Sequence, residues 1–321
     1  MFEIRTDLAV EEKESFPGNG GEVKGVSLKE WRRASGNIKL TEVVILDGMG
    51  ARAMGKPKGT YVTIEADDLG IQDEGYHREV SEELAAQIKK MVKGLRHRKE
   101  IPEEGSVQVL AVGLGNPSVT PDALGPQVLG NLRVNRNINM PKDGRGTILS
   151  GIVPGVMAQT GMETAEIIKG LIRETKPDMI VAIDALAARS IRRLGTTIQL
   201  TDTGIHPGSG VGNHRHSLTK ESLRVPVLAV GVPTVVGAAA IVHDTISTLI
   251  GTLASHMETK GMGDFLDQLD PDEQYQLIRE LLEPEFGSLY VTPPDIDQTL
   301  KRLSYTISEG IHLAFYESMQ Q

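Results

Sequence analysis

Two aspartates, Asp122 and Asp184, each follow an apolar run typical of a buried strand. Asp122 lies in the loop after VQVLAV (107–112), and Asp184 comes directly after MIVAI (179–183). The carboxyl ends of parallel strands meet at one edge of an α/β sheet, where such sheets bind their ligands. Two close carboxylates do not both ionise readily, so one can keep a proton while the other acts as a base on water. This arrangement suits an acid–base hydrolase.

Each aspartate also has a structural explanation. Thr120 and Pro121 suit the N-cap and first position of a helix, where the helix dipole favours an acidic Asp122. Asp184 could cap a turn or pair with one of the nearby arginines, Arg189, Arg192 and Arg193. These arginines and Arg215 could instead bind an acidic substrate side chain through charge-assisted hydrogen bonds. The residues alone leave both interpretations open.

A glycine-rich segment over residues 203–216 is the third candidate region, with the histidines His206, His214 and His216. Imidazoles can ligate a metal, although such a loop is also typical of solvated polar chain. Ser209 does not fit the nucleophile elbow GxSxG, because Pro and Val stand at the two glycine positions. The flexible glycines instead suit a substrate clamp, to which we assign His206 and Ser209.

Two nucleotide-binding patterns fail on inspection. Residues 50–56 match GxxxxGK, but Pro57 follows where a P-loop needs Ser or Thr to bind magnesium. The turn at residues 113–115 lacks the third glycine of GxGxxG, because Ser118 stands in its place. We therefore expect no nucleotide cofactor.

Composition narrows the function further. The 321 residues contain 34 Lys+Arg against 43 Asp+Glu, a net charge of −9, and no cysteine. The acidic balance argues against binding to nucleic acid phosphates, and the absence of cysteine excludes disulfides, thiolate metal sites and cysteine nucleophiles. The N-terminus has no apolar stretch of a secretory signal, so a cytoplasmic location is expected. The uncharged run 225–242 contains two prolines, and we expect a buried strand (225–230), a turn and a helix from about Thr234 rather than a membrane span.

The elements that position these residues alternate between strands and helices. Apolar residues recur with helical spacing over residues 80–95, and further helices are expected near 120, 160–175, 273–282 and 295–315. β-rich runs occupy 43–46, 60–66 and 196–200, besides the strands already named. This order predicts an α/β fold with a mainly parallel twisted sheet and helices on both faces, plus a β-rich segment near residues 43–66.

Several long motifs, taken in order, resemble the germination proteases of endospore-forming bacteria. They are RTDLA (5–9), VTPDALGP (119–126), AIDALAAR (182–189), GIHPGSGVGN (204–213) and VGVPTV (230–235). The resemblance implies an endopeptidase that degrades small acid-soluble spore proteins, with a fold like that of the hydrogenase maturation endopeptidases. It also implies catalytic roles for Asp122 and Asp184, a homotetramer, and a location in the developing spore or spore core.

The same resemblance implies a zymogen that processes its own N-terminus. Residues 2–11 read as an extended substrate-like strand with acidic and apolar positions. We predict cleavage between Asp7 and Leu8, with Glu3–Ile4 as second choice, leaving a propeptide of residues 1–7 and a single peptidase domain over 8–321.

Two alternatives to this metal-free aspartate mechanism stay open. The same aspartates could act with a metal held by His206 or His214. A non-catalytic α/β protein could use the 204–216 loop to hold an anion.

Overall fold

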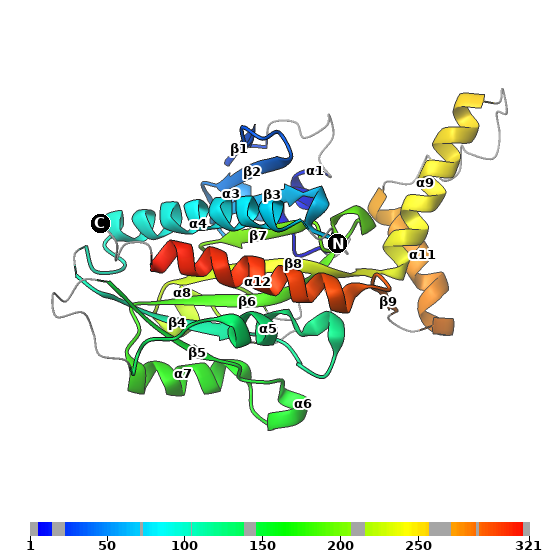
Figure 1. Cartoon of the computed structure of the whole chain (residues 1–321). Coiled ribbons are helices and arrows are strands. Elements are labelled where there is room, and N and C mark those ends of the chain that lie inside the picture. The colour runs from blue at the N-terminus through cyan, green and yellow to red at the C-terminus, as the bar shows by residue number, and fades with distance from the viewer. Residues whose placement is uncertain are drawn as a thin grey trace.

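The computed structural model describes residues 6–14, 23–70, 73–103, 105–137, 146–206, 216–256, 271–286 and 289–316. The strands in these ranges form one nine-stranded sheet of order β1-β2-β3-β7-β8-β6-β4-β5, with β9 paired to β8 (Figure 1). They are β1 (Val26–Arg32), β2 (Ile38–Ile45), β3 (Gly59–Ala66), β4 (Val107–Gly113), β5 (Thr147–Ile152), β6 (Met179–Ala188), β7 (Thr197–Thr201), β8 (Val227–Gly237) and β9 (Tyr290–Val291).

The sheet has a parallel half and an antiparallel half. Strands β8, β6, β4 and β5 are parallel, whereas β1, β2, β3 and β7 are antiparallel to their neighbours. Strand β7 joins the halves by pairing antiparallel with β8. The prediction of a mainly parallel sheet was therefore wrong. A parallel connection needs a crossover of a dozen or more residues, and residues 189–196 between β6 and β7 are too few.

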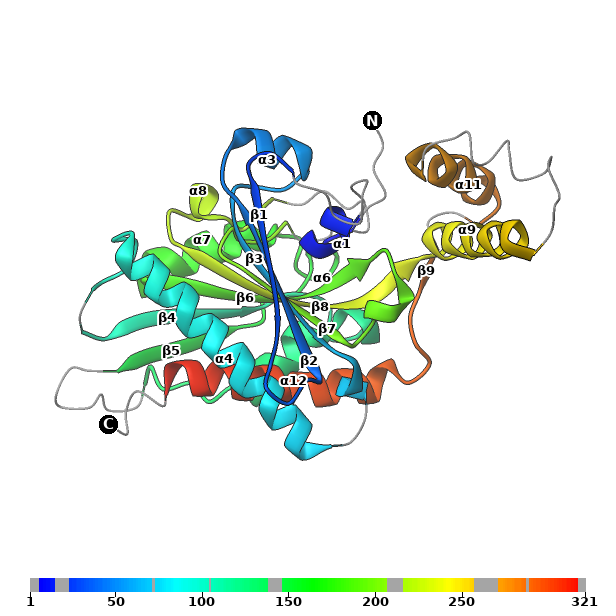
Figure 2. The same cartoon turned by 90° about the horizontal axis from the view of Figure 1, so that it is seen from above.

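Helices cover both faces of the sheet, as predicted (Figure 2). One face carries α4 (Glu74–His97), α5 (Leu124–Asn131) and α12 (Ile296–Phe315). The opposite face carries α1 (Ala9–Glu14), α7 (Thr164–Thr175) and α8 (Lys220–Leu223). Shorter helical segments are α3 (Gly48–Ala53), α6 (Met157–Thr160) and the 3-10 turns η1 (Asp67–Gly70), η2 (Thr120–Asp122) and η3 (Ile191–Arg193).

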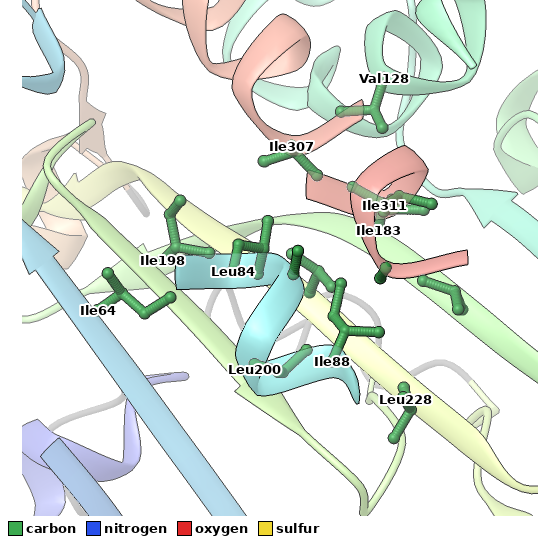
Figure 3. Packing of buried hydrophobic residues seen from close by; sticks show 14 of the residues in the cluster. Ile64, Leu84, Ile88, Val128, Ile183, Ile198, Leu200, Leu228, Ile307 and Ile311 are labelled. Atoms are coloured by element: carbon green, nitrogen blue, oxygen red, sulfur yellow. The ribbon is translucent and has the colours of Figure 1, made fainter. Parts of the chain in front are cut away.

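The larger core lies between the sheet and the α4–α12 pair. Leu84 and Ile88 of α4 and Ile307 of α12 are fully buried, and they face Ile198 and Leu200 of β7 (Figure 3). Their helical spacing explains this, because residues three or four positions apart share one face of a helix. Burial of each such side chain stabilises the fold by about 1.5–3 kcal/mol, so this face fixes the sheet on which the site is built.

Strand β8 departs from the prediction at its carboxyl end. We expected a turn after residue 230 and a helix from about Thr234, but the strand continues to Gly237 and α9 (Ala238–His256) begins at Ala238. Pairing with β7 stops at Gly231, and the register with β6 shifts between Leu186 and Ala187. Pro233 lies in this irregular stretch, where β8 no longer pairs with β7. A proline, which has no backbone N–H, therefore interrupts fewer strand hydrogen bonds here than it would in a strand paired on both sides.

Helices α9 and α11 (Pro271–Phe286) stand apart from the layered body as a projecting arm (Figures 1 and 2). The helices predicted at 273–282 and 295–315 are confirmed as α11 and α12. None of the helices in the part of the chain that the structure describes combines the length and the apolar character of a membrane span.

Candidate active site

Asp184 lies inside β6 rather than at its end. The strand continues to Ala188, so the expectation that it ends at Asp184 was wrong. The neighbouring strand β4 does stop there, because its last residue, Gly113, pairs with Ile183. Asp184 is thus the first residue of β6 beyond the end of β4, and its side chain is only 6% exposed. Its position still marks the carboxyl edge of the parallel half.

Asp122 closes the 3-10 turn η2, which follows β4. Val119 rather than Thr120 precedes the first turn, and the α-helix α5 begins only at Leu124. The Asp122 carboxylate accepts a hydrogen bond from the backbone N–H of Asn116 at 2.7 Å. The capping role expected of Thr120 is therefore not seen, and the carboxylate of Asp122 instead holds the loop that leaves the sheet.

Glycines bring the two aspartates to one cavity. A Cβ atom on Gly125 would lie 2.3 Å from the carbonyl oxygen of Leu114 and 2.7 Å from that of Ile183, so only glycine lets α5 approach β6 this closely. This contact sets η2 beside Asp184. Both aspartates line a cavity of about 440 Å³.

The N-terminal segment enters the same cavity. Asp7 lines it, and its backbone N–H donates to the carbonyl oxygen of Ala187 at 3.1 Å. The Ala187 N–H in turn donates to the Asp7 carboxylate at 2.9 Å. Leu8 and Ala9 are fully buried. The segment expected to be extended to residue 11 turns into α1 at Ala9, so that expectation was wrong for residues 9–11.

Gln199 and Lys56 contact the same stretch of chain. Gln199 Nε2 donates to the Asp7 carbonyl oxygen at 2.9 Å, and its Oε1 accepts from the Ala9 N–H at 2.7 Å. Lys56 Nζ donates to the carbonyl oxygens of Thr6 and Asp7 at 3.3 and 3.2 Å. Asp7, Lys56 and Gln199 line a second, smaller cavity of about 80 Å³. The Asp7 backbone is therefore held between two cavities.

Strand register explains this arrangement. Gly231 of β8 pairs with Asp184 of β6 on one side and with Gln199 of β7 on the other. Residues in one register row project to the same face, and two strand spacings separate their Cα atoms by about 10 Å. That space accommodates a peptide segment between Asp184 and Gln199.

A buried charge cluster anchors α1 next to the site. Arg193 forms ion pairs with Glu11 at 3.3 Å, Glu14 at 2.6 Å and Glu65 at 2.9 Å. Glu11 also accepts hydrogen bonds from the backbone N–H groups of Arg189 and Ser190. Burial raises the pKa of Glu11, although these hydrogen bonds and Arg193 oppose the shift.

The predicted substrate-binding arginines thus have different surroundings. Arg193 is 8% exposed and already surrounded by carboxylates, Arg189 is half-buried, and Arg192 is exposed. Binding of a substrate carboxylate by any of them stays a prediction.

The structure describes two histidines of the predicted loop, His206 and His216, and His216 lies 3.7 Å from the Glu163 carboxylate. His206 lines the smaller cavity, and partial burial and the Lys56 ammonium lower its pKa. Ser209, His214 and Arg215 lie outside the described residues. Within the described ranges, no group of three or more histidines and carboxylates is arranged to hold a metal ion.

Sequence reasoning missed Lys56, Gln199 and the backbone of Ala187. Lys56 belongs to the GxxxxGK pattern, which fails as a P-loop and indicates no other role for the lysine. Gln199 gave a weaker signal, as a polar side chain within the strand-like run TTIQL (196–200). A long polar residue at the centre of a buried strand needs hydrogen-bond partners, and here the partner is the chain's own N-terminal segment.

The fold and the cavity define a class of protein. Two carboxylates share a cavity at the edge of an α/β sheet, and a peptide segment of the chain is hydrogen-bonded along its backbone beside them. Such an arrangement suits an enzyme that acts on peptides.

Comparison with known proteins identifies the family. The family model described as germination protease matches residues 3–263, so the chain belongs to that family and is an endopeptidase. The germination protease of Caldanaerobacter subterraneus subsp. tengcongensis is 44% identical, over 99% of this chain and 96% of the relative. That of Clostridium tetani is 42% identical, over 99% and 97%, and that of Priestia megaterium 37%, over 100% and 96%. Membership of a peptidase family sets aside the non-catalytic alternative.

Proposed function

We propose that this endopeptidase degrades small acid-soluble spore proteins during germination, using Asp122 and Asp184 to activate water. It is made as a zymogen, removes residues 1–7 by its own cleavage of the Asp7–Leu8 bond, and acts in the spore core as a single peptidase domain over 8–321. One observation carries the proposal. Asp7 lines the cavity that both aspartates line, and the residues after it are buried.

The chemistry follows from the shared cavity. One carboxylate takes a proton from a water molecule as the water oxygen attacks the Asp7 carbonyl carbon, and the C=O electron pair moves onto the carbonyl oxygen. The other, protonated, carboxyl group then gives its proton to the Leu8 nitrogen. Collapse of the tetrahedral intermediate breaks the C–N bond, and the Leu8 nitrogen leaves with a proton. Positioned acid–base catalysis of this kind contributes about 10²–10⁴-fold in rate.

Recognition of an acidic residue before the cleaved bond is part of the proposal. The Ala187 N–H donates to the Asp7 carboxylate, and a protein substrate with Asp or Glu at that position would make the same contact. The net charge of −9 is consistent with an enzyme that recognises the protein substrate and not the nucleic acid it coats.

Asparagine substitution tests the aspartates. Wild-type protein should acquire a new N-terminus at Leu8, found by terminal sequencing, and should degrade an added small acid-soluble spore protein. Asp122→Asn and Asp184→Asn should keep their original N-terminus and the fold, whereas the exposed control Asp297→Asn should behave as wild type. Cleavage at the wild-type rate in either site variant, or a mature form that still begins at residue 1 or 2, would refute the proposal. Loss of activity with a chelator, restored by zinc, would favour the metal-assisted alternative.

Assembly as a homotetramer completes the proposal. Leu249 of α9 and Leu277 and Leu281 of α11 are exposed on the projecting arm, and clustered exposed apolar residues mark protein interfaces. Light scattering should give four times the 34.7 kDa chain mass, and Leu281→Lys should reduce it. A wild-type monomer would exclude the tetramer and leave the peptidase proposal standing.

A further inference from the structure

The carbonyl oxygen of Asp7 accepts hydrogen bonds from two side chains of the antiparallel half of the molecule. We propose that Lys56 Nζ and Gln199 Nε2 form the oxyanion-binding site of the enzyme, stabilising the negative charge that develops on the carbonyl oxygen of the cleaved bond. The inference rests on the proposed cleavage by Asp122 and Asp184, to which it adds two catalytic residues.

The orientation of Gln199 is fixed by its partners. The Ala9 backbone N–H can only donate, so the side-chain oxygen must face it, at 2.7 Å. The amide nitrogen then faces the Asp7 carbonyl oxygen, at 2.9 Å. Gln199 is 7% exposed, and its backbone pairs with Thr63 of β3 and Gly231 of β8. This donor is therefore held rigidly before the reaction, as oxyanion stabilisation requires.

Lys56 supplies the charge. Its ammonium donates to the carbonyl oxygens of Thr6 and Asp7. The loop that carries it is shaped by Gly55, at φ +57°, and by a hydrogen bond from the Tyr61 hydroxyl to the Pro57 carbonyl oxygen at 2.8 Å. Hydrogen bonds that involve a charged group are about twice as strong as neutral ones, and this one strengthens as the carbonyl oxygen becomes negative.

The groups proposed for proton transfer and those proposed for oxyanion binding line different cavities. Asp122 and Asp184 line the larger cavity, Lys56 and Gln199 line the smaller one, and Asp7 lines both. As water attacks the carbonyl carbon, its proton passes to a carboxylate and the C=O electron pair moves onto the oxygen held by Lys56 and Gln199. When this pair returns, the C–N bond breaks and the Leu8 nitrogen receives a proton from a carboxyl group. Water is the only co-reactant.

The same contacts suit other protein substrates. Gln199 and Lys56 hydrogen-bond backbone atoms, a carbonyl oxygen before the bond and an N–H after it. Backbone contacts do not depend on side chains, so once residues 1–7 leave, a carbonyl oxygen of an incoming chain can take the place of the Asp7 carbonyl oxygen. Ala187 then contributes selectivity for the acidic residue.

Steady-state kinetics with the processed enzyme and a synthetic peptide of residues 2–12 test the inference. Lys56→Met and Gln199→Glu should each lower kcat by about 10²–10³-fold, the range for loss of one oxyanion donor, with KM within threefold of wild type. Gln199→Glu removes the amide donor but keeps a side-chain oxygen that can accept the hydrogen bond from the Ala9 backbone N–H. Lys56→Arg should recover part of the rate, and the exposed neighbour Lys58→Met is the matched control. Circular dichroism and a thermal melt identify variants that fail to fold.

A second readout uses a peptide phosphinate whose P–O⁻ group replaces the cleaved carbonyl. Lys56→Met should weaken its binding by the same factor as kcat, while binding of a peptide of residues 2–7 that ends in a neutral C-terminal amide should change far less. A raised KM with unchanged kcat would overturn the inference in favour of substrate binding alone, as would equal phosphinate affinity in variant and wild type.

The aspartate variants separate the two proposals. If Asp184→Asn is inactive while Lys56→Met and Gln199→Glu keep the wild-type kcat, the oxyanion site is refuted and the proposed function stands. If either Asp122→Asn or Asp184→Asn cleaves at the wild-type rate, the proposed function fails, and this inference falls with it.

Discussion

The two halves of the sheet contribute different things to one site. The parallel half carries Asp122 and Asp184 at the carboxyl edge, where open α/β sheets place their ligands. The antiparallel half carries Gln199 and the loop with Lys56, which hold the backbone of the chain. The two aspartates thus lie at the parallel half, and the side chains that hydrogen-bond the N-terminal segment lie at the antiparallel half. The halves meet at Gly231, between Asp184 and Gln199 in register.

A methyl group added at Gly115 should disrupt the part of the site that the parallel half carries. Gly115 has φ +108°, and a Cβ there would lie 1.9 Å from the carbonyl oxygen of Asp122. Gly115→Ala should therefore displace the η2 turn, reduce the free energy of unfolding by about 2–4 kcal/mol and lower the cleavage rate at least 100-fold. Urea unfolding and peptide cleavage measure the two effects.

The matched control for Gly115→Ala is Gly130→Ala in α5. A Cβ at Gly130 meets nothing within 4 Å, so the change should stabilise the helix by about 0.5–1 kcal/mol and leave cleavage unchanged. Equal behaviour of the two variants would show that the η2 turn does not depend on Gly115.

The comparison also explains what the sequence could predict. Asp122 and Asp184 follow apolar runs of the chain, and the parallel strands bring such positions to one edge, so local pattern was enough to select them. Lys56 and Gln199 reach the site only because β7 pairs with both β3 and β8. This pairing joins residues 61–65 to 197–201, and no local signal encodes it. The sheet was predicted as mainly parallel for the same reason, and β1 and β5 were not anticipated.

Arg193 joins the antiparallel half to α1, and its loss should cost nearly as much stability as the Gly115 change. Arg193→Met leaves Glu11 buried without its cation, and breaking one partner of a buried ion pair costs about 3–5 kcal/mol. Burial of the apolar Met side chain offsets part of that cost, so we expect about 2–3 kcal/mol. Urea unfolding in an Asp184→Asn background avoids self-cleavage during the measurement.

The exposed neighbour Arg192 provides the control. Arg192→Met should change the free energy of unfolding by less than about 0.5 kcal/mol. A loss for Arg193→Met as small as this would mean that the charge cluster does not hold α1 in place.

Removal of the Asp7 side chain should separate the contribution of its contact with the parallel half from that of the backbone contacts with the antiparallel half. Asp7→Ala takes away the acceptor for the Ala187 N–H on the parallel half and leaves the backbone contacts with Gln199 and Lys56 intact. A hydrogen bond to a charged group contributes about 1.5–3 kcal/mol, so the rate of self-cleavage should fall about 10- to 100-fold. The rate should fall less in Asp7→Asn, because the amide oxygen of Asn still accepts a hydrogen bond from the Ala187 N–H. Mass spectrometry over time gives both rates, and an unchanged rate in Asp7→Ala would show that backbone contacts alone select the bond.

The smallest expected effect concerns pH. Burial raises the pKa of Glu11, so in a window that begins near its ordinary value of 4.5 the folded chain keeps a proton that the unfolded chain has lost. The unfolded state then binds fewer protons, and the free energy of unfolding falls as pH rises through the window. Glu11→Gln cannot titrate, so its stability should fall less between pH 4.5 and 7 in urea titrations, while Glu14→Gln, at the exposed end of the same cluster, should keep the wild-type slope. A wild-type slope in Glu11→Gln would assign the pH dependence to other groups.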